Sequence, residues 1–143
     1  MVRFEDRFFP ILVQHWPAKI SDDDVREYCE RQAPVTRKAI TDRTPFVMIT
    51  VGGSDLSVSQ RKMIAEWIRT LPPSWEDFNL GSFAVMHSVA ARGALTALKW
   101  LSPSLRKVSF VDSFEVAVEK ACEVLIRAKI SVPINLPELK RSA

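Results

Sequence analysis

The sequence has none of the features that mark membrane-spanning, secreted or metal-binding proteins. Its 143 residues include no apolar run near the ~20 residues that cross a bilayer. The first ten residues, MVRFEDRFFP, carry acidic side chains and no small-residue cleavage site, so we expect no signal peptide. No H-E-x-x-H, C-x-x-C or other metal-ligand spacing occurs. We therefore expect no membrane association, no metal and no cofactor.

The chain also has few cysteines and a small net charge. The two cysteines, Cys29 and Cys122, stand apart beside apolar neighbours, which predicts buried free thiols and a cytoplasmic protein. The formal charge is only +3, with basic residues spread along the chain. That bias is too weak to indicate a nucleic-acid partner or an anionic membrane. The composition, 47% hydrophobic and 26% charged, is that of a folded protein with a substantial core.

Four short apolar runs are separated by longer amphipathic segments, a pattern that predicts strands alternating with helices. The strands are expected at residues 8–16, 45–51, 83–89 and 106–111. The second run, PFVMITV, is continuous and rich in β-forming residues, which is typical of a strand covered on both faces.

The amphipathic segments after these strands are the expected helices. Pro34 predicts a kink or a break near Ala33 in the first of them. Trp67 and Trp100 lie on or beside the apolar stripes of the second and third, so we expect both in the core. Three helices begin with an expected capping-box pair. These pairs are Ser21 with Asp24, Ser57 with Gln60, and Asp112 with Glu115, and the last helix has the stripe Phe114, Ala117, Val118, Ala121 and Leu125.

This alternation predicts an α/β protein built from βαβ units with right-handed crossovers. We expect a single domain over residues 1–130, with a largely parallel sheet of four to five strands and flanking helices. The segment 131–143 contains two prolines and little periodicity, so we expect an extended or disordered tail on the surface.

The loop VGGSDLSVSQRK, residues 51–62, is the most site-like stretch of the chain. Gly52 and Gly53 have neither the spacing of a dinucleotide fingerprint nor that of a P-loop, and no G-x-S-x-G nucleophile turn occurs. We favour glycines that let the chain leave the strand with positive φ over a phosphate cradle. For Ser57 we favour a helix cap over regulatory phosphorylation, with catalysis by the loop serines as a third alternative.

Polar side chains also stand near the ends of the expected strands. His15, Thr50 and His87 could meet in a pocket together with Asp55, because ligands of open α/β sheets bind beyond the carboxyl ends of the strands. The alternative, which we favour, is that both histidines are half-buried, hydrogen-bonded parts of the framework.

Trp75 and Phe78 lie in the polar segment PPSWEDFN. If exposed, such an aromatic pair forms a partner-binding patch, since large rings contribute much of a binding hot spot. If packed down, it forms a local lid. The sequence leaves both alternatives open.

The order of these segments resembles the STAS and SpoIIAA-like superfamily, which contains the anti-sigma-factor antagonists. The resemblance covers about residues 8 to 128 and rests on three features of the chain. They are the element order, the strand PFVMITV leading into SDLSVSQRKMIAEW, and FAVMHSVAARGALTALKWL followed by VSFVDSFEVAVEKAC. The resemblance implies a compact mixed sheet flanked by helices, and a non-catalytic module that binds a protein partner.

In the antagonists, a cognate kinase phosphorylates a serine in an Asp-Ser-Ser-Gly turn, and this phosphorylation prevents partner binding. The similar stretch here is Asp55-Leu56-Ser57-Val58-Ser59. The resemblance therefore implies Asp55, Ser57 and Ser59 as regulatory residues, with the phosphate on Ser57 or Ser59. In this chain the serines are not adjacent and the trailing glycine is absent.

These observations lead to three hypotheses about function. The first is a STAS-like protein-interaction and regulatory module that is not an enzyme, whose partner is a kinase-type regulator or a second copy of the chain. Its partner surface combines the loop 52–59 with Trp75 and Phe78. The second is a small-ligand-binding or enzymatic domain with a pocket at the strand ends. The third is a structural subunit that self-associates through Trp75 and Phe78 or through a sheet edge.

Overall fold

A mixed five-stranded sheet forms the centre of the protein. The computed structural model describes residues 1–141, apart from the side chains of Ala33, Thr36 and Arg106. The strands are β1 (Arg3–Glu5), β2 (Ile11–Trp16), β3 (Phe46–Gly52), β4 (Asn79–Val85) and β5 (Val108–Val111). They lie side by side in chain order; β1 pairs antiparallel with β2, and all other neighbours are parallel. The α/β class and the largely parallel sheet are confirmed, while β1 was not predicted.

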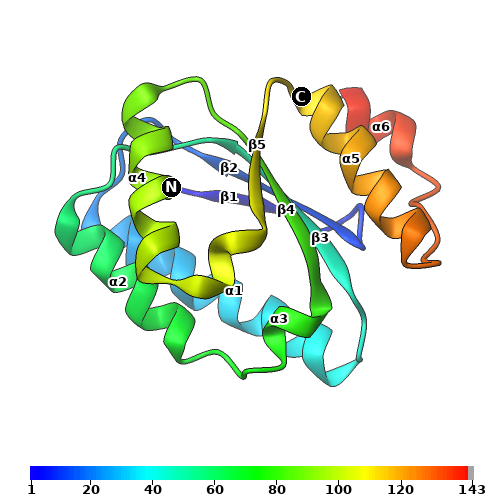
Figure 1. Cartoon of the computed structure of the whole chain (residues 1–143), viewed down its shortest axis with the longest axis horizontal. Coiled ribbons are helices and arrows are strands. Elements are labelled where there is room, and N and C mark those ends of the chain that lie inside the picture. Colours follow the sequence, from blue (N-terminus) through cyan, green and yellow to red (C-terminus); the bar gives the residue numbers. More distant parts are fainter. Residues whose placement is uncertain (142–143) are drawn as a thin grey trace.

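Helices cover both faces of the sheet (Figure 1). They are α1 (Asp22–Thr41), α2 (Val58–Arg69), α3 (Trp75–Phe78), α4 (Val89–Leu101), the 3₁₀ helix η1 (Pro103–Lys107), α5 (Phe114–Arg127) and α6 (Leu136–Arg141). The helices α1 to α4 lie in the crossovers between parallel strands and pack on one face, whereas α5 and α6 lie together on the other. A sheet covered in this way has two apolar layers rather than one.

The two layers follow from the alternation of side chains along each strand. Val13 and Ile49 face α5, whose five expected stripe residues are all buried. Leu12 and Met48 face the opposite way and pack with Ala39 of α1. The continuous apolar run of β3 is therefore explained by burial on both faces.

Helix capping agrees with the sequence at two of the three expected positions. Ser21 and Ser57 each close a complete capping box. At α5 the expectation of Asp112 as the cap is wrong. Ser113 is the N-cap, and its hydroxyl accepts a 3.1 Å hydrogen bond from the Val116 N–H. Serine and aspartate are about equally good caps, so two neighbouring candidates leave the helix start ambiguous by one residue.

The strand boundaries differ from the expected ones, most clearly in the first and the third expected strand. The first strand was expected from residue 8, but residues 7–10 form a turn and β2 begins at Ile11. The third was expected over 83–89, but β4 begins at Asn79 and already ends at Val85. The reason is that the Ser88 hydroxyl accepts from the Ala91 N–H and starts α4, so that Val89 is helical.

Two expectations about helices are also wrong. No break occurs at Pro34, since α1 continues to Thr41 with Gln32 and Ala39 buried on either side of the proline. The tail is not simply extended, because α6 forms within it and Leu139 is fully buried in the layer that contains α5. Ser142 and Ala143 lie outside the described residues. A six-residue helix is too short to produce a visible sequence period.

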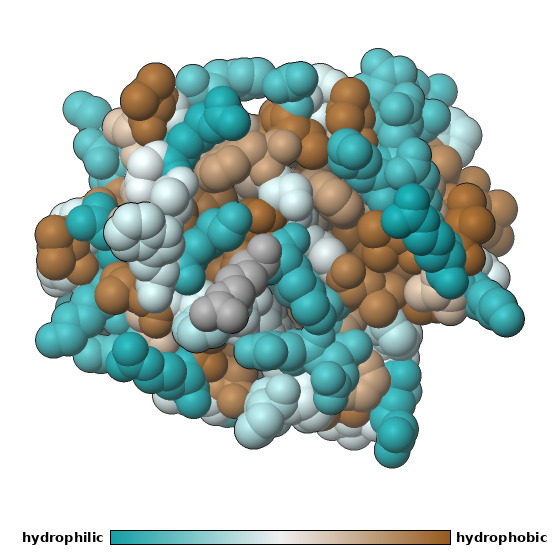
Figure 2. Space-filling model, in the orientation of Figure 1, coloured by the Kyte–Doolittle hydropathy of each residue, from teal (hydrophilic) through white to brown (hydrophobic). Residues whose placement is uncertain are grey.

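The surface holds one large side chain that was expected inside. Trp100 is 85% exposed, because it lies two residues, or about 200° of helix rotation, beyond the buried Leu98. Both cysteines are free and half-buried. On the face in Figure 2, hydrophobic side chains are interspersed among hydrophilic ones. No helix within residues 1–141 is long and apolar enough to cross a membrane.

Candidate functional site

A cavity of about 110 Å³ lies between the sheet and the helices of the α1–α4 layer. Its floor is formed by side chains of β2 to β5 that point to this face, and its walls by α1 to α4 and η1. The floor residues are Gln14, Trp16, Met48, Thr50, Asn79, Ser82 and Val108. A cavity of this size is well above the volume that holds one water molecule and slightly below the 150 Å³ cavity that binds benzene in another protein.

Four residues of the lining each hold a buried side-chain polar atom that has no hydrogen-bond partner among the described residues. These atoms are the side-chain oxygens of Gln14 and Gln32 and the indole nitrogens of Trp16 and Trp75. Gln14, Gln32 and Trp75 are each less than 10% exposed, so bulk water does not serve these groups. Leaving a polar group in such a position costs about 1–3 kcal/mol, which makes four of them around one cavity unusual.

Gln14 has two polar neighbours at the cavity, the hydroxyls of Thr50 and Tyr28. Its amide nitrogen donates a 2.7 Å hydrogen bond to the Thr50 hydroxyl on the neighbouring strand. The two residues stand opposite each other in the parallel β2–β3 register. Turning the amide over would exchange the unpartnered oxygen for an unpartnered NH₂ group. In either orientation one polar atom of Gln14 therefore lacks a protein partner.

Aromatic rings form a wall of the cavity. The Tyr28 ring of α1 lies 4.6 Å from the Trp16 ring and 5.8 Å from the Trp67 ring, measured between centroids. The two pairs are tilted by 59° and 65°, a near edge-to-face arrangement that suits ring quadrupoles. All three residues line the cavity, and Trp75 adds a fourth ring from α3. The cavity thus combines flat apolar surfaces with a few polar groups, as small-molecule sites do.

No charged side chain lines the cavity among the residues that the structure describes. Burial, with a smaller contribution from Cys29, raises the pKa of the Tyr28 hydroxyl above its usual range. Burial also raises the pKa of the neighbouring Cys29 thiol to about 11. Neither group ionises near neutral pH, so the surroundings of the cavity stay neutral there.

Gly52, the last residue of β3, and Gly53, which follows it, are explained by close packing. Gly52 has a φ of +75°, and a Cβ there would lie 2.6 Å from the Trp16 carbonyl oxygen. A Cβ at Gly53 would lie 2.8 Å from the Cβ of Ala91 in α4. The expected positive φ is confirmed at Gly52, whereas Gly53 is explained by its close packing against Ala91.

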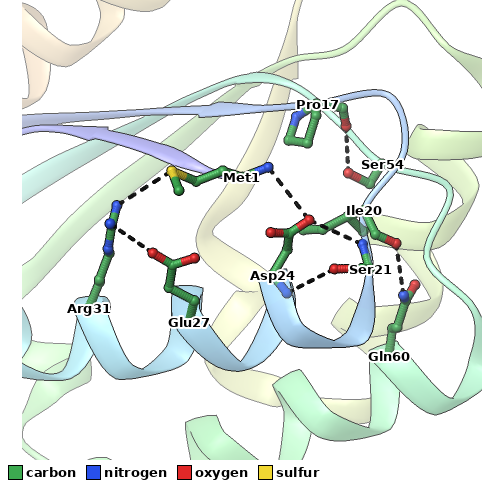
Figure 3. A network of polar contacts seen from close by, with 9 residues as sticks. All are labelled: Met1, Pro17, Ile20, Ser21, Asp24, Glu27, Arg31, Ser54 and Gln60. Carbon is green, nitrogen blue, oxygen red and sulfur yellow. Dashed lines mark hydrogen bonds and ion pairs between the residues drawn. The ribbon is translucent and has the colours of Figure 1, made fainter.

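Polar contacts hold the same loop beside the start of α1 (Figure 3). The buried Ser54 hydroxyl donates to the Pro17 carbonyl. The buried Gln60 amide donates to the Ile20 carbonyl at 3.0 Å and to the Asp22 carboxylate at 3.1 Å. The loops after β2 and β3 are thereby joined, and the loop that carries Gly53 and Ser54 is fixed at the end of the cavity that these two residues line.

Of the pocket residues expected from the sequence, Thr50 lines the cavity and the two histidines do not. Strand alternation turns His15 to the α5 face, away from Gln14 and Trp16. Burial, followed by the positive charge of Arg3, lowers the pKa of His15. His87 lies exposed beyond the end of β4. The structure therefore does not gather Thr50 and both histidines in this cavity.

The residues of the regulatory hypothesis lie on the outside of the same region. Asp55, Ser57 and Ser59 are exposed. The Ser57 hydroxyl accepts a 3.1 Å hydrogen bond from the Gln60 N–H, which is its capping role. Val58, between the serines, is 73% exposed.

Trp75 and Phe78 are the first and last residues of the short helix α3, and Trp75 is only 7% exposed. Trp75 packs with Phe46 and Met48 of β3, and Phe78 is partly buried in the same cluster. The exposed aromatic patch is thus not formed, and the alternative of an aromatic pair that packs down over its neighbours describes the structure. The reason is that α3 turns its first residue toward the sheet.

Sequence reasoning missed most of the cavity. Gln14, Gln32, Tyr28 and Ser82 were not singled out, although a signal exists for two of them. Gln14 and Ser82 are polar residues inside strands that are otherwise apolar. Together with Thr50 they occupy the same face of neighbouring strands, but that relation depends on a register that a single sequence does not reveal.

Comparisons with known proteins add no family to this description. No family model, no curated protein and no solved structure matches the chain. The described residues form an α/β domain with an aromatic-lined cavity between the sheet and one layer of helices.

Proposed function

We propose that this protein binds a small molecule in the cavity between the sheet and the α1–α4 layer. One observation carries the proposal: Gln14, Trp16, Gln32 and Trp75 all line a single cavity, and each holds a buried polar atom without a partner among the described residues. A ligand that hydrogen-bonds to these atoms removes the cost of leaving them unpaired. Retaining such groups lowers the stability of the empty protein, which is the usual consequence of maintaining a binding site.

The proposed role is binding rather than catalysis. The described lining contains the hydroxyls of Tyr28, Thr50, Ser54 and Ser82, but no histidine, carboxylate or amine that could exchange a proton with them. An activated nucleophile needs such a base within hydrogen-bond reach. The proposal keeps the cytoplasmic location that the two free thiols favour.

Tryptophan emission provides a direct test, because three of the four tryptophans line the cavity. The fourth, Trp100, is exposed and can be replaced by phenylalanine to remove its signal. The Trp100→Phe protein would be screened against neutral small molecules by tryptophan emission and by thermal unfolding. A binder at 100 times its Kd stabilises the folded state by about 2.7 kcal/mol. We expect at least one compound to change both readouts.

The matched variant is Leu95→Phe, which adds volume to a half-buried residue of the lining. We expect it to fold and to lose both responses. If Leu95→Phe responds as Trp100→Phe does, the ligand binds elsewhere. If no compound changes either readout, the cavity holds only water and the proposal is wrong.

A second candidate is the STAS-like interaction module regulated at Ser57 or Ser59. The supporting observation is that Val58 exposes a large apolar side chain between two exposed serines. A phosphate there adds about −1.5 to −2 charges to such a surface and would disfavour an apolar contact. The partner is a protein, with a kinase as the regulator.

This candidate is tested with Ser57→Asp and Ser59→Asp. Aspartate caps helices about as well as serine, so Ser57→Asp adds charge without removing the cap. Partners would be captured from a native lysate with wild-type and variant bait, and their affinities measured. We expect at least one variant to weaken a stoichiometric partner. Unchanged affinity for every partner in both variants would sink the regulatory role.

A further inference from the structure

The chemistry of the cavity also narrows the class of ligand, and this inference rests on the proposed function. We infer that the ligand is a neutral, planar ring of about five or six atoms that carries both a hydrogen-bond donor and a hydrogen-bond acceptor. Phenols and neutral nitrogen heterocycles belong to this class. Charge, hydrogen-bonding groups and shape each contribute an independent argument.

The charge of the ligand follows from the lining. The described residues around the cavity provide no cation or anion, and burial keeps the Tyr28 hydroxyl protonated. The nearby Lys99 ammonium donates to the Val108 carbonyl oxygen at 2.8 Å and is not part of the lining. An ionised ligand would lose its hydration without gaining a counter-charge, which is far more costly than burying a neutral molecule.

The unpartnered atoms of the lining residues indicate which hydrogen-bonding groups the ligand carries. The indole N–H groups of Trp16 and Trp75 can only donate, so the ligand must offer an acceptor. In the present orientation of the Gln14 and Gln32 amides the unpartnered atoms are oxygens, which accept, so the ligand offers an N–H or O–H donor as well. A purely apolar ligand would leave all four atoms unpaired.

The volume of the cavity and its aromatic walls indicate the shape of the ligand. About 110 Å³ is somewhat less than the 150 Å³ cavity that accepts benzene, which limits the ligand to about one ring. The rings of Trp16, Tyr28 and Trp67 offer flat faces and edges on one side. An aromatic ligand pairs with such faces in offset or edge-to-face geometry.

Phenol, benzene and benzoate test the three arguments, since they share a ring and differ in polarity and charge. The ¹⁵N-labelled protein would be titrated with each probe while the indole N–H resonances are followed. We expect phenol to shift the Trp16 and Trp75 resonances and to leave that of the exposed Trp100 unchanged. One net hydrogen bond corresponds to about tenfold tighter binding, so phenol should bind about ten times more tightly than benzene. Benzoate should not bind.

The outcomes separate the ligand class from the proposed function. If benzene binds as tightly as phenol, or if benzoate binds best, the class is wrong while the cavity remains a ligand site. If no probe shifts the Trp16 or Trp75 resonance, the cavity holds only water, and the class and the proposed function both fail.

A double variant examines the role of Gln14. Gln14→Leu combined with Thr50→Val removes the polar pair from the floor and keeps its approximate volume. We expect phenol to bind this variant about ten times more weakly, and benzene to bind as it does to the wild type. An unchanged preference for phenol would overturn the assignment of Gln14 as a ligand-binding group.

Discussion

The Gln14 amide donates a 2.7 Å hydrogen bond to the Thr50 hydroxyl, joining two buried parallel strands through their side chains. This bond lies on the floor of the cavity, and the other polar atom of the Gln14 amide has no partner within the part of the chain that the structure describes. The amide nitrogen of Gln14 thus has a structural role, and in the proposed function its amide oxygen binds the ligand. Changes at the two positions should affect stability and binding differently.

Thr50→Val should lower the free energy of unfolding by about 0.5–1.5 kcal/mol, because it removes the hydrogen bond from the Gln14 amide nitrogen and leaves Tyr28 as the remaining polar neighbour of Gln14. Combining it with Gln14→Leu removes both polar partners, so the double variant should return to within about 1 kcal/mol of the wild type or exceed it. Urea unfolding measures both effects. Thr96→Val on the exposed face of α4 is the control and should change stability by no more than about 0.5 kcal/mol. A double variant less stable than Thr50→Val alone would contradict this account.

Gly52→Ala should destabilise the protein by about 1–3 kcal/mol. The positive φ disfavours a side chain, and the new Cβ would lie 2.6 Å from the Trp16 carbonyl oxygen. Gly93→Ala is the matched substitution, since a Cβ in that exposed helical position meets nothing within 4 Å. It should stabilise the protein by about 0.4–1 kcal/mol. Equal effects of the two changes in a urea titration would refute the packing explanation for Gly52.

Leu139→Ala should cost about 2–5 kcal/mol, the usual range for emptying a fully buried leucine site. The expectation follows from the packing of α6 in the same layer as α5. Ile134→Ala removes a side chain that is fully exposed in the same tail and should have almost no effect. Thermal unfolding of the two variants distinguishes a tail that belongs to the core from one that merely lies on it. If both variants melt like the wild type, α6 contributes nothing to stability.

The stability of the protein should fall as the pH is lowered below about 6.5, the usual pKa of histidine. Burial lowers the pKa of His15 in the folded state, with Arg3 adding to the effect and Glu5 opposing it. Between the folded and unfolded pKa values the unfolded chain binds more protons, so the free energy of unfolding rises with pH in this window and is fully recovered above it.

His15→Gln should remove most of that pH dependence between pH 5 and pH 7.5. The matched control is His87→Gln, because His87 is the other histidine of the chain and is exposed. Midpoints of thermal unfolding across the pH range provide the measurement. A pH profile that His15→Gln leaves unchanged would assign the dependence to another group.

Much of the fold could be predicted from local patterns. The capping boxes at Ser21 and Ser57 and the stripe that begins at Phe114 depend only on neighbours within one helix, so the sequence contains all that is needed. The short elements α3 and α6 escaped prediction because one helical turn has no period. Trp100 was misplaced because an aromatic residue beside a stripe can lie on either side of its edge.

The amino-acid sequence by itself determined the alternation of strands and helices, the small net charge of +3, and the glycines at the end of β3. The tertiary structure alone decided where the candidate site is. Gln14 and Thr50 are 36 residues apart in the chain and meet only through strand register. Gln32 and Trp75 reach the same cavity from helices on either side of β3 in the chain. Such distant side chains are brought together by packing, which no local pattern encodes.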